Sequence, residues 1–301
     1  DSTPIKQVKE GGMKMSDYLM RDDAPLSDEE WAKLDELVVS AARKLLVGRR
    51  FIHLTGPLGI GVQTVPLPTV SGGEACLHDE EGCACQAGEC EVIQVTGHRF
   101  LSLPLIHQDF RLSWRDIEAS RRMGWPPELG PAAAASAACA RAEDELIFNG
   151  HPEHGYQGLL NADGRHTVPL GDWGESGQAF ADIVAATEAL VADGFYEPFA
   201  AVLSPALYAK TQRIAKGIGR LESKLIEDVA EGGLFRSPVL AENQGLVVAQ
   251  GGHNLDLVVA QDLVTAYLGP ENMDHHFRVL ESLVLRIKRP GAICTLEKKG
   301  K

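Results

Sequence analysis

A run of small residues between Pro131 and Asn149 constrains the fold of this chain most strongly. Alanine occupies eight of the eleven positions from 132 to 142, and alanine has the highest helix propensity of all residues. Pro131 suits the first position of a helix, and Gly150 suits the left-handed residue that ends one. The run therefore predicts a long, smooth helix against which a sheet or another subunit can pack closely.

The end of this predicted helix carries three consecutive acids, Glu143, Asp144 and Glu145. The helix macrodipole disfavours negative charge near the C-terminal end, by ~0.3–1 kcal/mol for each group. We therefore expect groups outside the helix to pair with these carboxylates.

Composition excludes several classes of protein. The chain has 301 residues and a formal net charge of −13, which disfavours a nucleic-acid partner because such proteins normally carry a basic face. It holds no run of about 20 apolar residues that would predict a membrane span. Residues 1–12 lack the basic and apolar segments of a signal peptide. We therefore expect a cytoplasmic protein without a membrane partner.

The first half of the chain reads as a helix followed by a long hairpin. Ser27 and Glu30 have the spacing of a capping box, and the apolar residues that follow recur at helical spacing up to Gly48. Strand-like residues 62–70 then precede a polar, cysteine-rich insert at 71–90. Further strands are expected at 91–96 and 100–114. The apolar stripe of the helix comprises Trp31, Leu34, Leu37, Val38, Ala41, Ala42, Leu45 and Leu46.

The second half of the chain reads as mixed helix and strand, so we expect an α+β fold. Residues 177–192 predict an amphipathic helix that Gly194 ends, and 200–203 predict a buried strand. Ser204 and Pro205 suit the start of a helix, and 210–223 read as a loop between two helices. Two strand pairs are expected, 246–250 with 255–260 and 277–288 with 292–297.

Four cysteines, Cys76, Cys83, Cys85 and Cys90, lie within fifteen residues. Thiolate clusters bind zinc or iron–sulfur, but the usual spacing is CxxC and the central pair here is CxC. Metal binding, a disulfide cross-link at a protruding tip and an exposed insert without a dedicated role all remain open. Cys139 and Cys294 lie in a predicted helix and strand, where we expect small buried hydrophobes.

The sequence carries no motif of a known catalytic site. The segment His151-Pro152-Glu153-His154 lacks the HExxH order, and Pro152 predicts a turn rather than a zinc-binding helix. Gly217-Ile218-Gly219 lacks the third glycine of a dinucleotide-binding loop, and no GxSxG, Walker or kinase signature is present. We therefore expect a protein that is not an enzyme.

Read in order from Tyr18 to Glu297, the chain resembles the encapsulins, the shell proteins of bacterial nanocompartments. Within that family it is most similar to the iron-sequestering type of myxobacteria in segments 114–119, 167–173, 266–269 and 292–297. The segments that carry the family resemblance are Ala24–Ser27 with Trp31, Gly48–Phe51, Gly56–Gly59, Leu103–Ile106, Glu143–Phe148 and Gln261–Leu263.

The resemblance implies the tailed-phage major-capsid fold, which is Hong Kong 97 phage-like, and a self-assembling icosahedral shell. It also implies a domain layout in sequence order. The expected parts are an N-terminal extension of unknown role (1–17), an N-terminal arm with a lumen-facing amphipathic helix (18–58), an extended loop with a cysteine-rich tip (59–103), a peripheral domain with the alanine-rich spine helix (104–197), an axial domain (198–268), and strands that return to the peripheral domain and the base of the extended loop (269–301).

The resemblance further implies two sites. A groove on the lumen side is expected to bind a short C-terminal peptide of a cargo enzyme, and a loop is expected to line a five-fold pore. In that loop, Lys216 and Arg220 either bias anion entry or are merely solvated. The cargo-binding residues are expected to be Leu34, Leu37, Val38, Ala41, Leu45, Arg49 and Phe51, and the pore residues Lys216, Gly217, Ile218, Gly219 and Arg220.

The expected cargo is a ferritin-like protein for iron oxidation and storage, and otherwise a peroxidase. Some family members hold a flavin against a tryptophan, but Arg115 stands at the matching position beside Trp114. We therefore expect no cofactor, apart from a metal if the cysteine cluster binds one. Two alternatives to the shell are a prophage major capsid protein and a metal-binding redox protein that uses the cysteine cluster.

Overall fold

The computed structural model describes residues 17–72, 78–79, 82–83 and 92–298. Cys76, Cys85 and Cys90 lie outside the described residues, and only the backbone of Cys83 is described. The described residues form two compact units. The first comprises residues up to Lys44, His107–Cys139 and Leu263–Leu280. The second comprises Leu45–Ile106, Ala140–Asp262 and the residues from Glu281 onward.

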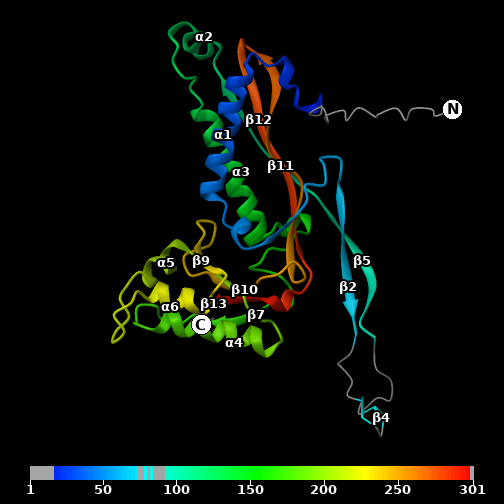
Figure 1. Cartoon of the computed structure of the whole chain (residues 1–301), viewed down its shortest axis with the longest axis vertical. Coiled ribbons are helices and arrows are strands. Elements are labelled where there is room, and N and C mark those ends of the chain that lie inside the picture. Colours follow the sequence, from blue (N-terminus) through cyan, green and yellow to red (C-terminus); the bar gives the residue numbers. More distant parts are fainter. Residues whose placement is uncertain (1–16, 73–77, 80–81, 84–91, 299–301) are drawn as a thin grey trace, which may run out of the picture. The chain divides into compact units, whose positions relative to one another are not determined.

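Helix α1 (Asp28–Leu45) supplies much of the core of the first unit (Figure 1). Its capping box forms as predicted, because the amide of Glu30 donates to the hydroxyl of Ser27 at 3.3 Å and the amide of Ser27 donates to the Glu30 carboxylate at 2.7 Å. Trp31 meets Phe277 edge-on, with ring centroids 5.8 Å apart. Part of the apolar stripe therefore packs in the protein's own core. The buried residues of α1 are Trp31, Leu34, Val38 and Ala42.

Helix α3 (Gly130–Asn149) confirms the predicted alanine-rich helix. In the first unit its small residues permit close packing, and the hydroxyl of Ser136 donates to the carbonyl of Val38 at 2.6 Å. Gly150 ends the helix with a φ of 66°, in the left-handed region that glycine enters without strain. The remaining helices of the first unit are η1 (Asp17–Leu19), η2 (Arg21–Asp23) and α2 (Trp114–Met123).

A five-stranded sheet and three helices form the core of the second unit (Figure 1). The central strands are buried along their whole length, which explains their continuous apolar sequence. Helix α4 (Gln178–Ala192) packs against this sheet, and α5 (Pro205–Thr211) and α6 (Glu222–Val229) follow. All three were predicted. The strand order is β7 (His166–Pro169), β13 (Ile293–Glu297), β10 (Gly245–Ala249), β8 (Phe199–Leu203) and β9 (Gly233–Arg236).

The two predicted strand pairs are wrong. Strand β10 pairs with β8 and β13 rather than with the strand that follows it. The long strands β11 (Leu255–Glu271) and β12 (Asp274–Ile287) instead neighbour each other in a second sheet, whose order is β1 (His53–Thr55), β11, β12 and β6 (Leu105–Leu112). The apolar pattern identified each strand, but it did not identify the partner.

The predicted long hairpin is confirmed, with different strand limits. Strand β2 (Thr64–Ser71) pairs antiparallel with β5 (Gln94–Ser102), and Thr64 lies opposite Ser102. The two strands expected on either side of residues 97–99 are not separated there, since β5 continues through these residues. Leu103 and Pro104 separate β5 from β6. The two-residue strands β3 (His78–Asp79) and β4 (Gly82–Cys83) pair within the insert. Several apolar residues of the hairpin are exposed, namely Val70, Val92, Ile93, Val95 and Phe100.

Three further short 3-10 helices complete the description: η3 (Gly48–Arg50), η4 (Pro152–His154) and η5 (Pro290–Ala292). In the part of the chain that the structure describes, no helix has both the length and the apolar content needed to cross a lipid bilayer.

Candidate functional site

The predicted cargo-binding residues divide into buried and accessible ones. Leu34 and Val38 are 0% and 1% exposed in the first unit, and Phe51 is 6% exposed in the second, where its ring stacks on Phe235 at 5.8 Å. A side chain buried in this way offers no surface to a peptide. Leu37 and Ala41 are half-buried, and Leu45 is 39% exposed. Of the predicted apolar cargo-binding residues, Leu37, Ala41 and Leu45 are therefore the ones that a peptide can contact.

Arg49 is held in a network of carboxylates within the second unit. Its guanidinium contacts Glu143 at 2.8 Å, Glu281 at 2.9 Å and Asp262 at 2.7 Å. The side chains of Glu143 and Glu281 are 0% and 1% exposed, and that of Arg49 is 15% exposed. Because three carboxylates engage the guanidinium, Arg49 acts here as a bridge inside the chain, whereas the resemblance implies a contact for a cargo peptide.

The network contains more acids than cations. Burial and the charge of Glu143 together raise the pKa of Glu281 to about 9, although Arg49 opposes the shift. The carboxylates hold the pKa of Arg49 above its ordinary value, although burial acts in the opposite direction. The protonated form of Glu281 is therefore favoured, and Glu143 and Asp262 supply the negative charge opposite Arg49.

Asp144 lies next to this network and caps backbone groups. Its carboxylate accepts hydrogen bonds from the amides of Val47, at 3.0 and 3.1 Å, and Gly48, at 2.9 Å. Burial raises the pKa of Asp144 to about 7, although these two amides oppose the shift. Gly48 also has no room for a side chain, since a Cβ atom there would lie 2.6 Å from Ile147.

The expectation that the terminal acids of α3 pair outside the helix is thus confirmed for two of the three. Glu143 contacts Arg49 and Asp144 contacts the amides of Val47 and Gly48. Glu145 instead pairs with Arg141 of the same helix, at 3.0 Å.

Within the second unit, a buried ion pair fixes the base of the hairpin. Arg286 contacts Asp256 at 2.6 Å and donates to the carbonyl of Pro66, on β2, at 3.0 Å. Burial raises the pKa of Asp256, but hydrogen bonds from Arg286 and Thr55 outweigh it and hold the pKa below its ordinary value. Arg286 therefore joins β12 to the first strand of the hairpin.

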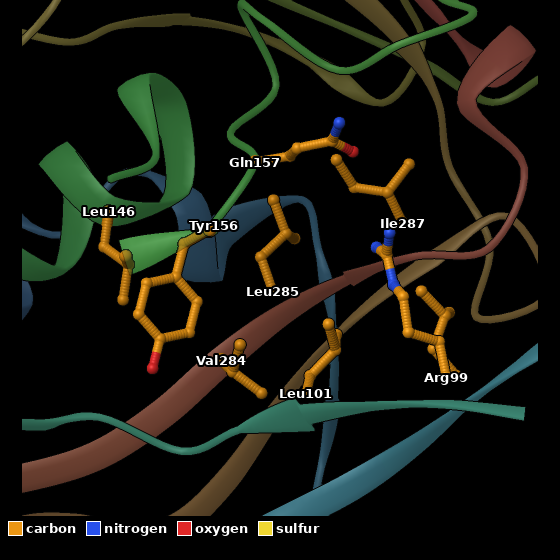
Figure 2. A pocket seen from close by; sticks show the side chains of 10 residues that line it. Arg99, Leu101, Leu146, Tyr156, Gln157, Val284, Leu285 and Ile287 are labelled. Atoms are coloured by element: carbon orange, nitrogen blue, oxygen red, sulfur yellow. The ribbon is translucent and has the colours of Figure 1, made fainter. Parts of the chain in front are cut away.

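A small cavity lies between β5, β12 and the segment after α3 (Figure 2). Leu101 from β5, Val284 from β12 and Tyr156 from the segment after α3 line it, and Arg99 and Gln157 add polar groups. Its volume is about 20 Å³, enough for about one water molecule. The cavity is therefore a packing gap at the base of the hairpin, too small for an organic ligand.

A larger concave surface of about 480 Å³ lies at the start of α1. Asp22, Asp28 and Asp35 contribute carboxylates to its lining, and the guanidinium of Arg21 lies over the ring of Trp31 at 4.5 Å and contacts Asp35 at 2.7 Å. No motif in the sequence indicated this surface, because η2 and α1 bring its residues together through the fold.

The predicted pore residues lie on a loop with a firmly anchored base. Glu222 is fully buried, contacts Arg213 at 2.7 Å and accepts a hydrogen bond from the amide of Gly177 at 2.9 Å. Between these anchors the chain from Lys216 to Arg220 is exposed, and Ile218 is 58% exposed. The prediction of a loop between two helices is confirmed.

The two cations of the loop differ in their surroundings. Arg220 contacts Asp228 of α6 at 2.8 Å, which offsets its charge. Within the described ranges, the exposed side chain of Lys216 forms no ion pair. Lys216 is therefore the cation of this loop whose charge reaches solvent without a neighbouring carboxylate.

Two cysteines and a tryptophan complete the residues that the sequence analysis singled out. Cys139 and Cys294 are buried, as predicted, and burial raises the pKa of the Cys294 thiol to about 12. Trp114 begins α2 and is 37% exposed, with the guanidinium of Arg115 at 5.8 Å from its ring centroid.

Comparisons with solved structures agree on the fold. A virus-like particle of Pyrococcus furiosus matches with a TM-score of 0.71 at 23% identity, and the match covers 89% of this chain and all of that one. The capsid of the phage XM1 matches with a TM-score of 0.55 at 15% identity, covering 82% of this chain and 89% of that one. The chain therefore has the tailed-phage major-capsid fold that the resemblance predicts.

Comparisons of sequence identify the family. The family described as encapsulating protein for peroxidase matches residues 15–284. The type 1 encapsulin shell protein EncA of Myxococcus xanthus is 47% identical over 95% of this chain and 98% of its own length. A diheme-cytochrome-encapsulin shell fusion protein of Kuenenia stuttgartiensis is 40% identical over 90% of this chain and 74% of its own length. These relatives are named as shell proteins, so the chain belongs to the encapsulin family of self-assembling shell proteins, as its sequence predicts.

Proposed function

We propose that this chain closes into an icosahedral shell in the cytoplasm and encloses a ferritin-like protein that oxidises and stores iron. The observation that carries the proposal is the 47% identity to the Myxococcus xanthus shell protein, which extends over 98% of that relative. The shell itself performs no reaction. Its wall retains the cargo and the mineral, while openings between subunits admit ions.

The choice of cargo has separate support. A ferritin-like-encapsulin shell fusion protein of Pyrococcus furiosus is 25% identical over 68% of this chain, although the match covers only 55% of that fusion protein. The segments that resemble the iron-sequestering myxobacterial type point to the same cargo. The family description names a peroxidase, which makes a peroxidase the second candidate.

Particles purified from the native organism test the choice of cargo directly. Mass spectrometry of the enclosed protein, together with measurement of bound iron, distinguishes the two candidates. A ferritin-like protein and an iron-rich interior are the expected result. An enclosed haem peroxidase without an iron deposit would contradict the proposal.

We assign cargo docking to the accessible apolar residues of α1. Leu37 and Ala41 are half-buried and Leu45 is exposed, and residues four positions apart lie on one side of a helix. A small residue at position 41 leaves space for an aliphatic side chain of a bound peptide. Because carboxylates engage Arg49, the polar anchors are Asp22 and Asp28 on the concave surface at the start of α1.

Substitution of Leu37 tests the docking surface without entering the core. Leu37→Asp is expected to lower loading at least tenfold, because an apolar contact of this size contributes about 2 kcal/mol. The cargo probe is a fluorescent protein fused to the C-terminal segment of the ferritin-like protein encoded in the same genome. Glu36→Gln, which changes the charge by one unit at an exposed position of the same helix, is the control.

Electron microscopy of each variant separates loss of docking from loss of the shell. Intact empty particles of Leu37→Asp with normally loaded particles of Glu36→Gln support the assignment. Particles of Leu37→Asp that load as much fluorescent protein as the wild type would contradict it.

A further inference from the structure

Three side chains of types that commonly ligate metals lie close together at the turn after α3. His151, Glu153 and His154 each offer a ligand atom, and these atoms lie within 4.8 Å of one another. The Nδ1 atoms of the two histidines are 2.9 Å apart, and their rings are almost perpendicular, with centroids at 4.3 Å. All three residues are exposed, so an ion can reach them from solvent.

The backbone of this turn is fixed by several hydrogen bonds. The amide of His151 donates to the carbonyl of Tyr156 at 2.8 Å, and the amide of Tyr156 donates back at 3.1 Å. Within the turn, the amide of His154 donates to the carbonyl of His151 at 3.0 Å. Pro152 begins the 3-10 helix, and Gly155 ends it with a φ of 76°. The ligating side chains therefore project from a rigid segment.

The turn is also tied to the end of α3. The amide of Leu159 donates to the carbonyl of Ile147 at 2.9 Å, and the side-chain amide of Asn161 donates to the carbonyl of Asn149 at 2.7 Å. Tyr156, directly after the turn, contributes to the cavity at the base of the hairpin (Figure 2). Preorganisation of this kind lowers the entropic cost of binding an ion.

We propose that this turn binds a divalent transition-metal ion through Nδ1 of His151, Nδ1 of His154 and a carboxylate oxygen of Glu153. Two imidazoles and one carboxylate are ligands that zinc and ferrous iron accept. Water completes the coordination, because the site is open on one side. Nothing in this assignment depends on the identity of the cargo.

The distance between the two Nδ1 atoms fits this role. Without an ion, atoms 2.9 Å apart form a hydrogen bond in which one ring carries its proton on Nδ1. In a tetrahedral site with metal–nitrogen bonds of 2.0–2.1 Å, the two nitrogens lie about 3.4 Å apart. A small rotation of either side chain supplies the difference, and the displaced proton moves to Nε2 of the same ring.

The 3-10 helix explains why the site lacks the usual sequence order. In the HExxH motif, the two histidines lie four residues apart and share one face of an α-helix. A 3-10 helix has three residues per turn, so residues three apart lie directly above one another. His154 is the last residue of the helix and His151 is the N-cap directly before it, three residues away, and their Nδ1 atoms lie 2.9 Å apart. The sequence correctly predicted a turn, but the turn brings the ligands together.

Titration of assembled wild-type particles with Zn²⁺, followed by calorimetry, tests the site. The double variant His151→Ala and His154→Ala is expected to bind one ion fewer per chain than the wild type. The cysteine cluster is unchanged in both proteins, so the difference counts this site alone. His98→Ala, which removes an exposed histidine of β5, is expected to leave the number unchanged.

Glu153→Gln provides a milder variant in which both histidines remain. It is expected to weaken binding at this site about tenfold, because a neutral amide replaces the one carboxylate ligand. Absorption of bound Co²⁺ reports the loss of a nitrogen-ligated ion independently of the calorimetry. If all of these variants bind as many ions as the wild type, with equal affinity, the site does not exist.

Discussion

Arg49 joins segments that are far apart in the sequence. It contacts Glu143 near the end of α3, Glu281 in β12 and Asp262 in β11. Removal of one partner from a buried ion pair leaves an uncompensated buried charge, and this costs far more than the net contribution of the pair itself. The network therefore makes the second unit sensitive to a single substitution.

Arg49→Ala is expected to destabilise the protein by about 3–5 kcal/mol, because it leaves Glu143 buried without its cation. For a chain of this size, the thermal unfolding midpoint should fall by about 10 °C. Arg141→Ala, which removes an exposed ion pair with Glu145, is the control and should change the midpoint little, because exposed ion pairs contribute about 0–1 kcal/mol. Equal midpoints for the two variants would show that the network contributes nothing to stability.

Asp144 makes stability depend on pH. Its pKa is raised from 3.8 to about 7 by burial, so between these values the folded chain retains a proton that the unfolded chain has lost. Stability from this group is therefore fully present below about pH 4 and is lost as the pH rises through about 7, by on the order of 4 kcal/mol at most.

Asp144→Asn removes the titrating group and keeps one oxygen to accept a backbone hydrogen bond. As the pH rises from about 5 to about 8, the thermal midpoint of the wild type should fall relative to that of this variant. Comparison of the two proteins isolates Asp144 from Glu281, whose raised pKa acts in the same direction at higher pH. A difference in midpoint that does not change with pH would contradict the assignment.

At the scale of elements, helices were more predictable than strand partners. The helices and their ends followed from local signals, such as the capping box at Ser27 and the glycines at 150 and 194. The turn between β11 and β12 gave no such signal, since Asn272 and Met273 both have positive φ and methionine is rarely found there. Without a recognised turn, the two longest strands could not be paired from the sequence.

The cargo surface was only partly predictable for a related reason. A stripe of apolar residues has the same spacing whether it faces the core or a ligand. Leu34 and Val38 are buried while Leu37 is half-buried, and only the packing of other elements decides which of them is accessible. The terminal acids of α3 were more informative, because charge at an unfavourable position requires a partner.

The loop that contains Lys216 allows a test of the pore proposal. Lys216→Gln removes a positive charge that repels Fe²⁺. The rate of Fe²⁺ entry into loaded shells is therefore expected to rise about twofold. The joint substitution Arg220→Gln and Asp228→Asn removes a contacting pair of opposite charges and should leave the rate unchanged. Equal rates for all three proteins would remove the loop from the ion pathway.

At the scale of the whole molecule, the fold does not by itself determine the function. Phage capsids share the fold at 15% identity, so the fold alone does not distinguish a shell for a genome from a shell for an enzyme. Identity of 47% over nearly the whole chain places this protein with the encapsulin shells, which leaves the prophage capsid as the less supported alternative. In a closed shell, symmetry repeats each modest subunit contact many times.

Electron microscopy of the purified full-length protein in negative stain, with gel filtration beside it, tests the central claim most directly. Uniform hollow particles with icosahedral symmetry, eluting far ahead of a 32.5 kDa monomer, are the predicted result. Monomers or small oligomers at concentrations where related shells are assembled would contradict the account of this chain as a self-assembling shell protein.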